Sequence, residues 1–217
     1  MKEAVLKEIS DVSSYLCKTG LIAGTSGNVS ARIPQTDLIA VTPSGISYDL
    51  YAADIMCVVD ADGNQLEGPY RPSSETPMHM ALMKAMPWVN AIIHTHSPYA
   101  VTFAVLGEPI AVVSVEGLKF GASLIYPTDG FITPGSPDTG RAILKAVEKP
   151  DAAKNAVLLR NHGLVVMGET IAQTLDLAQS AELTARIYYQ ARAVGDPIRL
   201  TKEQITRASA QYISKKK

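Results

Sequence analysis

The sequence has few cysteines, few charges and no long hydrophobic run, and each shortage argues against a class of protein. Its 2 cysteines, Cys17 and Cys57, lie in apolar segments and are expected to be core residues, not a disulfide framework. Charged residues make up 19% and the net charge is −1, which argues against general binding to nucleic acids or membrane surfaces. No apolar run is long enough to cross a bilayer, and the start lacks the basic and apolar segments of a signal peptide. We therefore expect a soluble, cytoplasmic protein.

The pattern of apolar and turn-forming residues predicts a single domain over residues 1–217. Hydrophobic residues make up 47%, enough for a large core, and no repeat or linker divides the chain. Helical spacing of apolar residues predicts helices, and short apolar runs between turn signals predict strands. Helices are predicted over 3–18, 75–86, 97–106, 136–147, 170–193 and from 201 onward, and strands over 27–33, 38–42, 55–60, 89–94, 110–115, 156–159 and 164–167.

The order of these elements favours an α/β fold with a central sheet, mostly antiparallel or mixed, flanked by helices. The strands are irregularly spaced and the glycine-rich dinucleotide-binding fingerprint is absent, so a Rossmann fold is disfavoured. Three helix starts carry capping signals. Ser74 is a predicted N-cap, and Thr170 with Gln173 and Thr201 with Gln204 form capping-box pairs.

Three of the four histidines lie in two short motifs, His-Thr-His at 94–96 and Asn-His-Gly at 161–163. Because side chains alternate along a strand, His94 and His96 are expected to point to the same face. His162, from a distant strand, can complete a three-histidine set with one open position, which is typical of catalytic zinc sites. Neutral imidazoles suit zinc and other late divalent ions better than magnesium or calcium. The motifs therefore predict a metal-dependent enzyme.

Glu75, which follows a serine pair, is the carboxylate predicted to act beside this metal site. A glutamate in the first turn of a helix is also favoured by the helix dipole alone. Beside a metal ion, however, a carboxylate can serve as a fourth ligand, as a general base, or as both in turn. His79 lies one helical turn after Glu75 and is expected to lie behind the ligands or on the surface, not to bind the metal.

Three short clusters of small polar residues are candidates for binding a phosphate group. Each offers backbone N–H groups and hydroxyl or amide donors, and the last lies at a helix N-terminus. Individually they are ordinary turn residues. No lysine-bearing P-loop is present, so a nucleoside triphosphate is not indicated. The clusters are Gly27-Asn28, Ser44-Gly45 and Ser73-Ser74.

Five motifs follow one another along the chain: Gly-Asn-Val-Ser at 27–30, Thr-Pro-Ser-Gly at 42–45, Ser-Ser-Glu at 73–75 and the two histidine motifs. In this order they resemble the class II aldolase/adducin family over most of the chain. The family includes L-fuculose-1-phosphate aldolase, L-rhamnulose-1-phosphate aldolase, L-ribulose-5-phosphate 4-epimerase, methylthioribulose-1-phosphate dehydratase and the non-enzymatic adducin head domain. The Ser-Ser-Glu motif is most similar to the fuculose-phosphate aldolase pattern.

The resemblance implies a three-layer α/β/α fold and a set of roles. It implies that His94, His96 and His162 bind one zinc ion per subunit, or another divalent transition metal. It implies that Glu75 is a further ligand and the catalytic base. The implied reaction is reversible cleavage of a ketose 1-phosphate, similar to L-fuculose 1-phosphate, to dihydroxyacetone phosphate and an aldehyde through a metal-stabilised enediolate. It also implies a cyclic homotetramer with active sites at subunit interfaces. The substrate phosphate would be bound by Gly27, Asn28, Ser44, Gly45, Ser73 and Ser74.

The chain departs from the fuculose-phosphate aldolase where that enzyme has a catalytic tyrosine, shortly after the His-x-His helix. The corresponding stretch here, 112–116, reads Val-Val-Ser-Val-Glu. Glu116 is our hypothesis for a substitute proton donor, with a solvated helix-start glutamate as the alternative. The family's second tyrosine comes from a neighbour's C-terminal segment, where Tyr212 is the candidate.

Other functions stay open at this stage. A 4-epimerase, a sugar-phosphate dehydratase or a decarboxylase of a phosphorylated oxo-acid would use the same metal and phosphate site. Glu75 argues mildly against the epimerase, which typically carries Asp there. A class I aldolase would need a Schiff-base lysine, for which Lys84 and Lys119 exist, but the histidine set makes it superfluous. A non-catalytic adducin-like scaffold would be expected to lose the ligands, which this chain retains.

Overall fold

The strands gather into one large sheet and one small one. The computed structural model describes residues 1–214, with side chains described as far as residue 210. The strands are β1 (Asn28–Arg32), β2 (Ile39–Val41), β3 (Cys57–Val59), β4 (Gln65–Glu67), β5 (Ala91–Thr95), β6 (Ile110–Ala111), β7 (Leu124–Ile125), β8 (Ala156–Leu159) and β9 (Gly163–Gly168). Seven of them form a sheet in the order β4-β3-β2-β1-β5-β9-β8, with every neighbouring pair antiparallel. The central sheet predicted to be mostly antiparallel or mixed is confirmed, and of these two forms it is the antiparallel one. Strands β6 and β7 pair separately.

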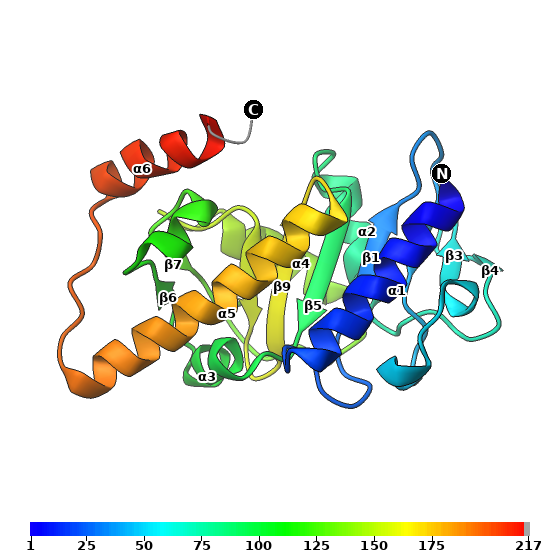
Figure 1. Ribbon diagram of the computed structural model, residues 1–217, viewed down its shortest axis with the longest axis horizontal. Helices are drawn as coiled ribbons and strands as arrows, with labels where there is room; N and C mark the ends of the chain where they lie inside the picture. Colours follow the sequence, from blue (N-terminus) through cyan, green and yellow to red (C-terminus); the bar gives the residue numbers. More distant parts are fainter. Residues whose placement is uncertain (215–217) are drawn as a thin grey trace.

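Helices cover both faces of this sheet. Figure 1 shows α1 and α5 running side by side across one face, with α6 reached through an extended segment. Within residues 1–214, no helix combines the length and apolar character that a transmembrane span needs. The helices are α1 (Lys2–Lys18), α2 (Thr76–Ala85), α3 (Pro98–Leu106), α4 (Asp138–Val147), α5 (Ile171–Val194) and α6 (Lys202–Ser214), and the 3-10 turns are η1 (Tyr48–Leu50), η2 (Ala53–Ile55) and η3 (Val115–Phe120).

Two hydrophobic clusters, one on each face of the sheet, create the three layers. Neighbouring residues of β5 divide between them: Ile93 packs in the cluster that contains α1, α3 and α5, whereas Ile92 packs in the cluster that contains α2 and α4. In β9, Val166 and Val165 divide in the same way. The alternation follows from the period of 2 in a strand, and the unbroken apolar runs of the central strands reflect burial on both faces. The expected three-layer α/β/α architecture is therefore present.

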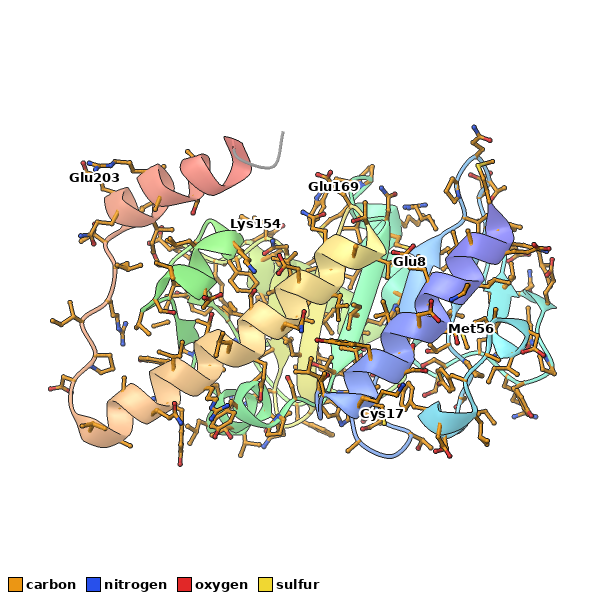
Figure 2. All side chains as sticks on the ribbon, in the orientation of Figure 1. Glu8, Cys17, Met56, Lys154, Glu169 and Glu203 are labelled. Atoms are coloured by element: carbon orange, nitrogen blue, oxygen red, sulfur yellow. The ribbon has the colours of Figure 1, made fainter. Side chains whose placement is uncertain are left out.

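The two cysteines lie apart and unpaired, as expected. Cys17 is half-buried near the end of α1 (Figure 2), and Cys57 is buried in β3. Both contact hydrophobic clusters of the core, Cys17 on the α1 face and Cys57 on the α2 face. Neither contributes to the histidine site described below.

Several local predictions needed correction. The strand predicted over 110–115 ends at Ala111, because Val112 packs with Leu118 and Ile205 while the chain turns into η3. Short strands β4 and β7 were not predicted. The N-cap prediction for Ser74 is wrong: Glu75 is the N-cap of α2. The two capping pairs are present, since Thr170 Oγ1 and Thr201 Oγ1 each accept a hydrogen bond from the backbone N–H three residues later.

Candidate metal and active site

The fold brings the three predicted histidines to one point at the end of the sheet. His94 lies in β5, His96 follows that strand, and His162 lies in the turn between β8 and β9. The Nε2 atom of His94 is 3.1 Å from Nε2 of His96 and 3.3 Å from Nε2 of His162. Nitrogens bound at ~2.0–2.1 Å to a tetrahedral zinc ion are ~3.3 Å apart. The three rings are therefore spaced as ligands of a single cation would be.

The hydrogen bonding of His94 directs a lone pair into this site. Its Nδ1 lies 3.0 Å from the carbonyl oxygen of Leu164. Because a carbonyl oxygen only accepts, Nδ1 carries the proton, and in the neutral ring Nε2 is left as a lone pair that faces the other histidines. A backbone carbonyl behind the ring is a common partner of metal-binding histidines.

Burial keeps the three rings in the form that a metal requires. Burial, followed by the nearby rings of His162 and His96, lowers the pKa of His94 well below its ordinary value. Burial is also the main cause that lowers the pKa of His96 and of His162. Neutral imidazole is the ligand form of histidine, so the site is ready for a cation near neutral pH.

Two residues of the β8–β9 turn allow His162 to approach. Asn161 has φ 57°, in the left-handed region that asparagine tolerates better than most residues. At Gly163 there is no room for a side chain, because a Cβ atom would lie 2.5 Å from the Thr95 carbonyl oxygen and 2.7 Å from Cε1 of His94. The glycine thus lets β9 lie against the histidine strand.

Glu75 lies beside the three histidines and is the candidate for a fourth donor. Its Oε2 lies 3.2 Å from Nε2 of His94, and its Oε1 lies 3.8 Å from Nε2 of His162. The side chain is buried, and Oε1 has no hydrogen-bond partner among the described residues. A buried carboxylate oxygen without a partner is costly unless a cation balances it. Three neutral nitrogens and this oxygen therefore fit a divalent metal ion.

The three candidate phosphate clusters also come together. Asn28 pairs with His94 across β1 and β5. The backbone of Thr42 bonds to Val29 on one side and to Ser73 on the other, with N···O distances of 3.0 Å in both cases. Ser44 N donates to the carbonyl oxygen of Arg71 at 2.9 Å. The segments 42–44 and 71–73 therefore run side by side next to the start of β1, the strand that pairs with the histidine strand β5.

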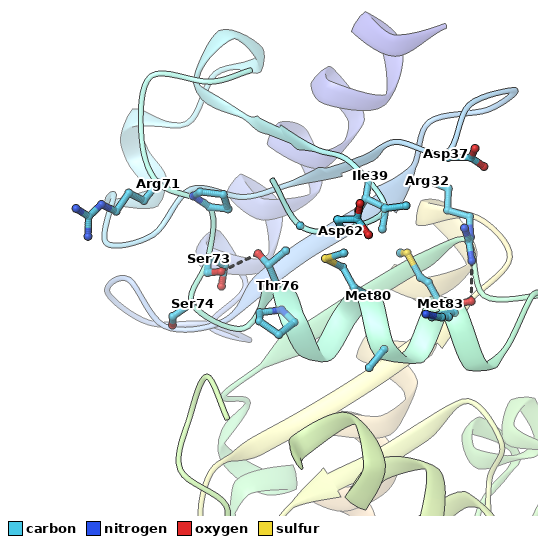
Figure 3. Close-up of a pocket in the computed structure, with 16 residues that line it drawn as sticks. Arg32, Asp37, Ile39, Asp62, Arg71, Ser73, Ser74, Thr76, Met80 and Met83 are labelled. Carbon is cyan, nitrogen blue, oxygen red and sulfur yellow. Dashed lines mark hydrogen bonds between the residues drawn. The ribbon is translucent and has the colours of Figure 1, made fainter. Parts of the chain in front are cut away.

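Ser73 and Ser74 also line a cavity of about 880 Å³ along the start of α2. Figure 3 shows them at one end of it, with Met80 and Met83 further along the helix. Neither Glu75 nor any of the three metal-site histidines lines this cavity, so it is not the metal site itself.

Glycine is required at position 27 for a similar reason as at 163. Gly27 has φ +80°, and a Cβ atom there would lie 2.7 Å from the carbonyl oxygen of His94. The next residue, Asn28, differs from the other residues of the phosphate clusters. Its carboxamide is buried and forms hydrogen bonds with the side chains of Glu75 and His79.

Sequence reasoning missed Ser30 and left open whether His79 lies behind the ligands or on the surface; the structure places both residues behind the site. His79 is completely buried, with Ser30 Oγ 2.6 Å from its Nδ1. The available signals were the spacing of His79 four residues after Glu75 on a helix and of Ser30 two residues after Asn28 on a strand. Each spacing places both residues of a pair on one face.

The structure does not bring every candidate to the histidines. Glu116 lies in η3, which packs against α5 and α6, and no described contact joins it to the histidine site. Tyr212 lies outside the residues whose side chains are described. Lys119 pairs with Asp176 at 2.6 Å, and Lys84 lines the cavity beside α2, so neither lysine is placed as a Schiff-base residue beside Glu75.

Comparison with known proteins gives the family. The profile described as "Class II Aldolase and Adducin N-terminal domain" matches residues 7–189. The chain is 31% identical over 210 residues to 5-deoxy-D-ribulose 1-phosphate aldolase of Bacillus thuringiensis serovar kurstaki, covering 95% of each chain. It is 30% identical over 202 residues to 5-methylthioribulose-1-phosphate/5-deoxyribulose-1-phosphate aldolase of Rhodospirillum rubrum, covering 93% of this chain and 88% of the relative. A solved structure of L-fuculose 1-phosphate aldolase superposes with a TM-score of 0.87 at 29% identity, over 97% of this chain and 96% of that one.

The fold is thus shared with a solved aldolase, and the chain carries a group of three histidines that could hold a metal ion, as expected of a metal-dependent carbon–carbon lyase. The chain belongs to the class II aldolase and adducin family, and within it to the aldolases. The resemblance noted from the five motifs is confirmed.

Proposed function

We propose that this aldolase cleaves a ketose 1-phosphate reversibly to dihydroxyacetone phosphate and an aldehyde. The observation that carries the proposal is that three histidine Nε2 atoms lie together beside the buried Glu75 carboxylate, whose Oε1 has no hydrogen-bond partner among the described residues. Ketose 1-phosphates are the substrates named for the similar enzymes from B. thuringiensis and R. rubrum and for L-fuculose 1-phosphate aldolase. We therefore infer a substrate of this class, such as 5-deoxyribulose 1-phosphate or L-fuculose 1-phosphate.

His94, His96 and His162 would hold the metal ion, with Glu75 as an additional ligand. A divalent ion bound there, zinc in our proposal, supplies stabilisation of the negative charge that develops on substrate oxygens as the carbon–carbon bond breaks. The neutral histidines leave the full charge of the ion available, since they contribute none of their own. The hydrogen bond from His94 to the Leu164 carbonyl keeps that ring oriented.

Glu75 is the base in this proposal. In the synthetic direction its carboxylate takes a proton from the hydroxymethyl carbon of dihydroxyacetone phosphate, and in cleavage it returns that proton to the same carbon. Oε2 already accepts a hydrogen bond from Asn28 at 2.8 Å, whereas Oε1 has no partner among the described residues and would carry the proton once substrate displaces it from the metal. By binding the substrate phosphate, the phosphate clusters would hold the reacting carbon beside this oxygen, and such positioning lowers the barrier to proton transfer.

A second group has to take the proton of the C4 hydroxyl as the C3–C4 bond breaks. One proton then leaves this hydroxyl and one arrives at C3, so the reaction balances. Glu116 is our candidate, and because no described contact joins it to its own histidines, we propose that it acts at the site of a neighbouring subunit. Exposed Val115 and Ile198 are consistent with burial in the homotetramer that the resemblance implies. Light scattering of the purified protein measures this oligomeric state.

The cytoplasmic location of the protein stays a prediction.

Product analysis tests the proposed reaction. Zinc-loaded protein is incubated separately with 5-deoxyribulose 1-phosphate, L-fuculose 1-phosphate and L-ribulose 5-phosphate, and dihydroxyacetone phosphate is measured by enzymatic reduction coupled to NADH oxidation. We expect dihydroxyacetone phosphate from a ketose 1-phosphate only. Conversion of ribulose 5-phosphate to its C4 epimer, or loss of water from a ketose 1-phosphate, would contradict the proposal in favour of an epimerase or a dehydratase. Absence of stoichiometric metal after careful purification would point to an adducin-like scaffold.

A further inference from the structure

A chain of four buried polar side chains leads from strand β1 to the candidate base. Ser30 Oγ lies 2.6 Å from Nδ1 of His79, and Nε2 of His79 lies 2.5 Å from Oδ1 of Asn28. Nδ2 of Asn28 then lies 2.8 Å from Oε2 of Glu75. All four residues are buried, and His79 and Ser30 have no exposed surface. Nothing in the proposed reaction uses His79 or Ser30.

Only one direction of donation satisfies all three hydrogen bonds. An ionised carboxylate accepts and cannot donate, so Asn28 must turn its amide hydrogens toward Glu75 and its oxygen toward His79. That oxygen needs a donor, so the proton of His79 is on Nε2. In the neutral ring Nδ1 is then an acceptor, and the hydroxyl of Ser30 donates to it. Every link therefore donates toward Glu75.

The charge state of His79 agrees with this direction. Burial lowers the pKa of His79 to about 3, although the charge of Glu75 acts in the opposite sense. The ring is therefore neutral near pH 7 and has one donor and one acceptor. If the Asn28 amide were reversed, its oxygen would face the Glu75 carboxylate and two acceptors would meet there, whichever nitrogen of His79 carried the proton. The ionised carboxylate therefore fixes the orientation of the amide, and the Nε2–H group of His79 supplies the donor that the Asn28 oxygen then needs.

The four residues of this hydrogen-bond chain come from two elements, two residues from each. Asn28 and Ser30 lie two residues apart on β1, and Glu75 and His79 lie four residues apart at the start of α2. Asn28 is also the neighbour of His94 across the sheet. The chain therefore fastens the first turn of α2, and with it the carboxylate, to the strand beside the metal ligands.

We propose that His79 is a positioning residue for the aldol reaction, holding the Asn28 amide so that it donates to Oε2 of Glu75 and leaves Oε1 to take the proton. This inference rests on the proposed function, since it assigns His79 a task only if Glu75 is the base. It places His79 two hydrogen bonds away from the carboxylate and in contact with neither metal nor substrate.

The first test replaces the ring and measures kcat, KM and bound zinc together. In His79→Leu, which removes both hydrogen bonds, we expect kcat to fall by about tenfold or more while zinc stoichiometry and KM for the ketose 1-phosphate stay near wild type. His79→Gln should recover most of the loss, because a side-chain amide can donate to Asn28 and accept from Ser30. Leu82→Ala is the control for general loosening of α2, because it shortens another buried side chain of the same helix. At temperatures below the Tm of this variant, its kcat should stay near the wild-type value.

Wild-type kcat in zinc-loaded His79→Leu would overturn the proposal, as would equal impairment of His79→Gln and His79→Leu. If His79→Leu does not fold, Ser30→Ala takes its place. This variant keeps the ring but removes the donor to Nδ1, so kcat should fall by a smaller factor. An unchanged kcat in Ser30→Ala would then contradict the role proposed for this series of hydrogen bonds.

A second test does not depend on activity and so separates this inference from the proposed function. Nitrogen-15 NMR of the histidine rings at pH 7 should show His79 protonated on Nε2 and His94 protonated on Nδ1. A His79 ring protonated on Nδ1, or on both nitrogens, would overturn the direction of the chain even if the aldolase reaction is observed. If the protein cleaves no ketose 1-phosphate, the proposed function fails while the tautomer result still decides the hydrogen-bond chain.

Discussion

Replacing Gly163 by alanine should weaken both the fold and the metal site. The new Cβ atom would lie 2.5 Å from the Thr95 carbonyl oxygen, 2.7 Å from His94 Cε1 and 3.1 Å from His96 Cδ2. Ordinary contacts are roughly 3.5 Å, so β5 and β9 must separate locally by about 1 Å. Overpacking of this kind costs about 1–3 kcal/mol, because the obstructing atoms are backbone and ring atoms that cannot swing away.

The same displacement moves His94 and His96, two histidines of the proposed metal site. We expect a fall in Tm of roughly 2–12 °C for a chain of this size. We also expect a loss of roughly 10–100-fold in zinc affinity, the usual effect of disturbing groups that orient ligands. Thermal unfolding of the metal-free protein measures the first effect, and competition with a chromophoric zinc chelator measures the second.

Gly195→Ala is the matched control. Gly195 has φ 175°, which is extended backbone that any residue adopts, and a Cβ atom there meets nothing within 4 Å. This variant should change stability by less than about 0.5 kcal/mol and leave zinc affinity unaltered. If Gly163→Ala equals the wild-type protein in both Tm and zinc affinity, the account of the β8–β9 turn is wrong.

Removing the metal should abolish turnover and lower Tm, and added zinc should restore both; at a thousand times its Kd, zinc stabilises by about 4 kcal/mol. Calorimetry and activity before and after chelation check this, and chelator-resistant activity would favour a Schiff-base mechanism. The metal-free protein should lose stability as pH falls from 6.5 toward 3, because folded His79 stays neutral while the unfolded chain takes up a proton. Urea unfolding at pH 7 and pH 5 measures this, and greater stability at pH 5 would disagree. Thr170→Ala should cost about 1 kcal/mol, since it removes the N-cap bond of α5, and unaltered urea unfolding would count against that cap.

The fold was predictable where the pattern of apolar residues was long or flanked by turn signals. The helix predicted over 170–193 is α5, Ile171–Val194, because a capping pair marks its start and tertiary packing supports its whole length. The short strands β4 and β7 were not predictable, since two or three residues carry no period. The residues of β4 are exposed, and pairing at the sheet edge alone defines that strand.

The candidate site, like the fold, could be predicted only where it depends on residues close together in the sequence. That His94 and His96 share a face follows from strand geometry alone. Local sequence cannot place His162 beside them, because that depends on the pairing of β5 with β9. Nor could it orient Asn28, whose amide is turned by the charge of Glu75 and the tautomer of His79 rather than by its own neighbours.

Hydrogen exchange into dihydroxyacetone phosphate tests the central claim most directly. The compound is incubated in D₂O with zinc-loaded wild type, with chelator-stripped wild type and with zinc-loaded Glu75→Gln, and deuterium at the carbon bearing the free hydroxyl is followed by NMR. We predict zinc-dependent exchange in the wild type and a loss of about 10²–10⁴-fold in Glu75→Gln, with zinc still bound. Exchange at a near wild-type rate in Glu75→Gln, or in the stripped protein, would contradict a metal-dependent aldolase with Glu75 as its base.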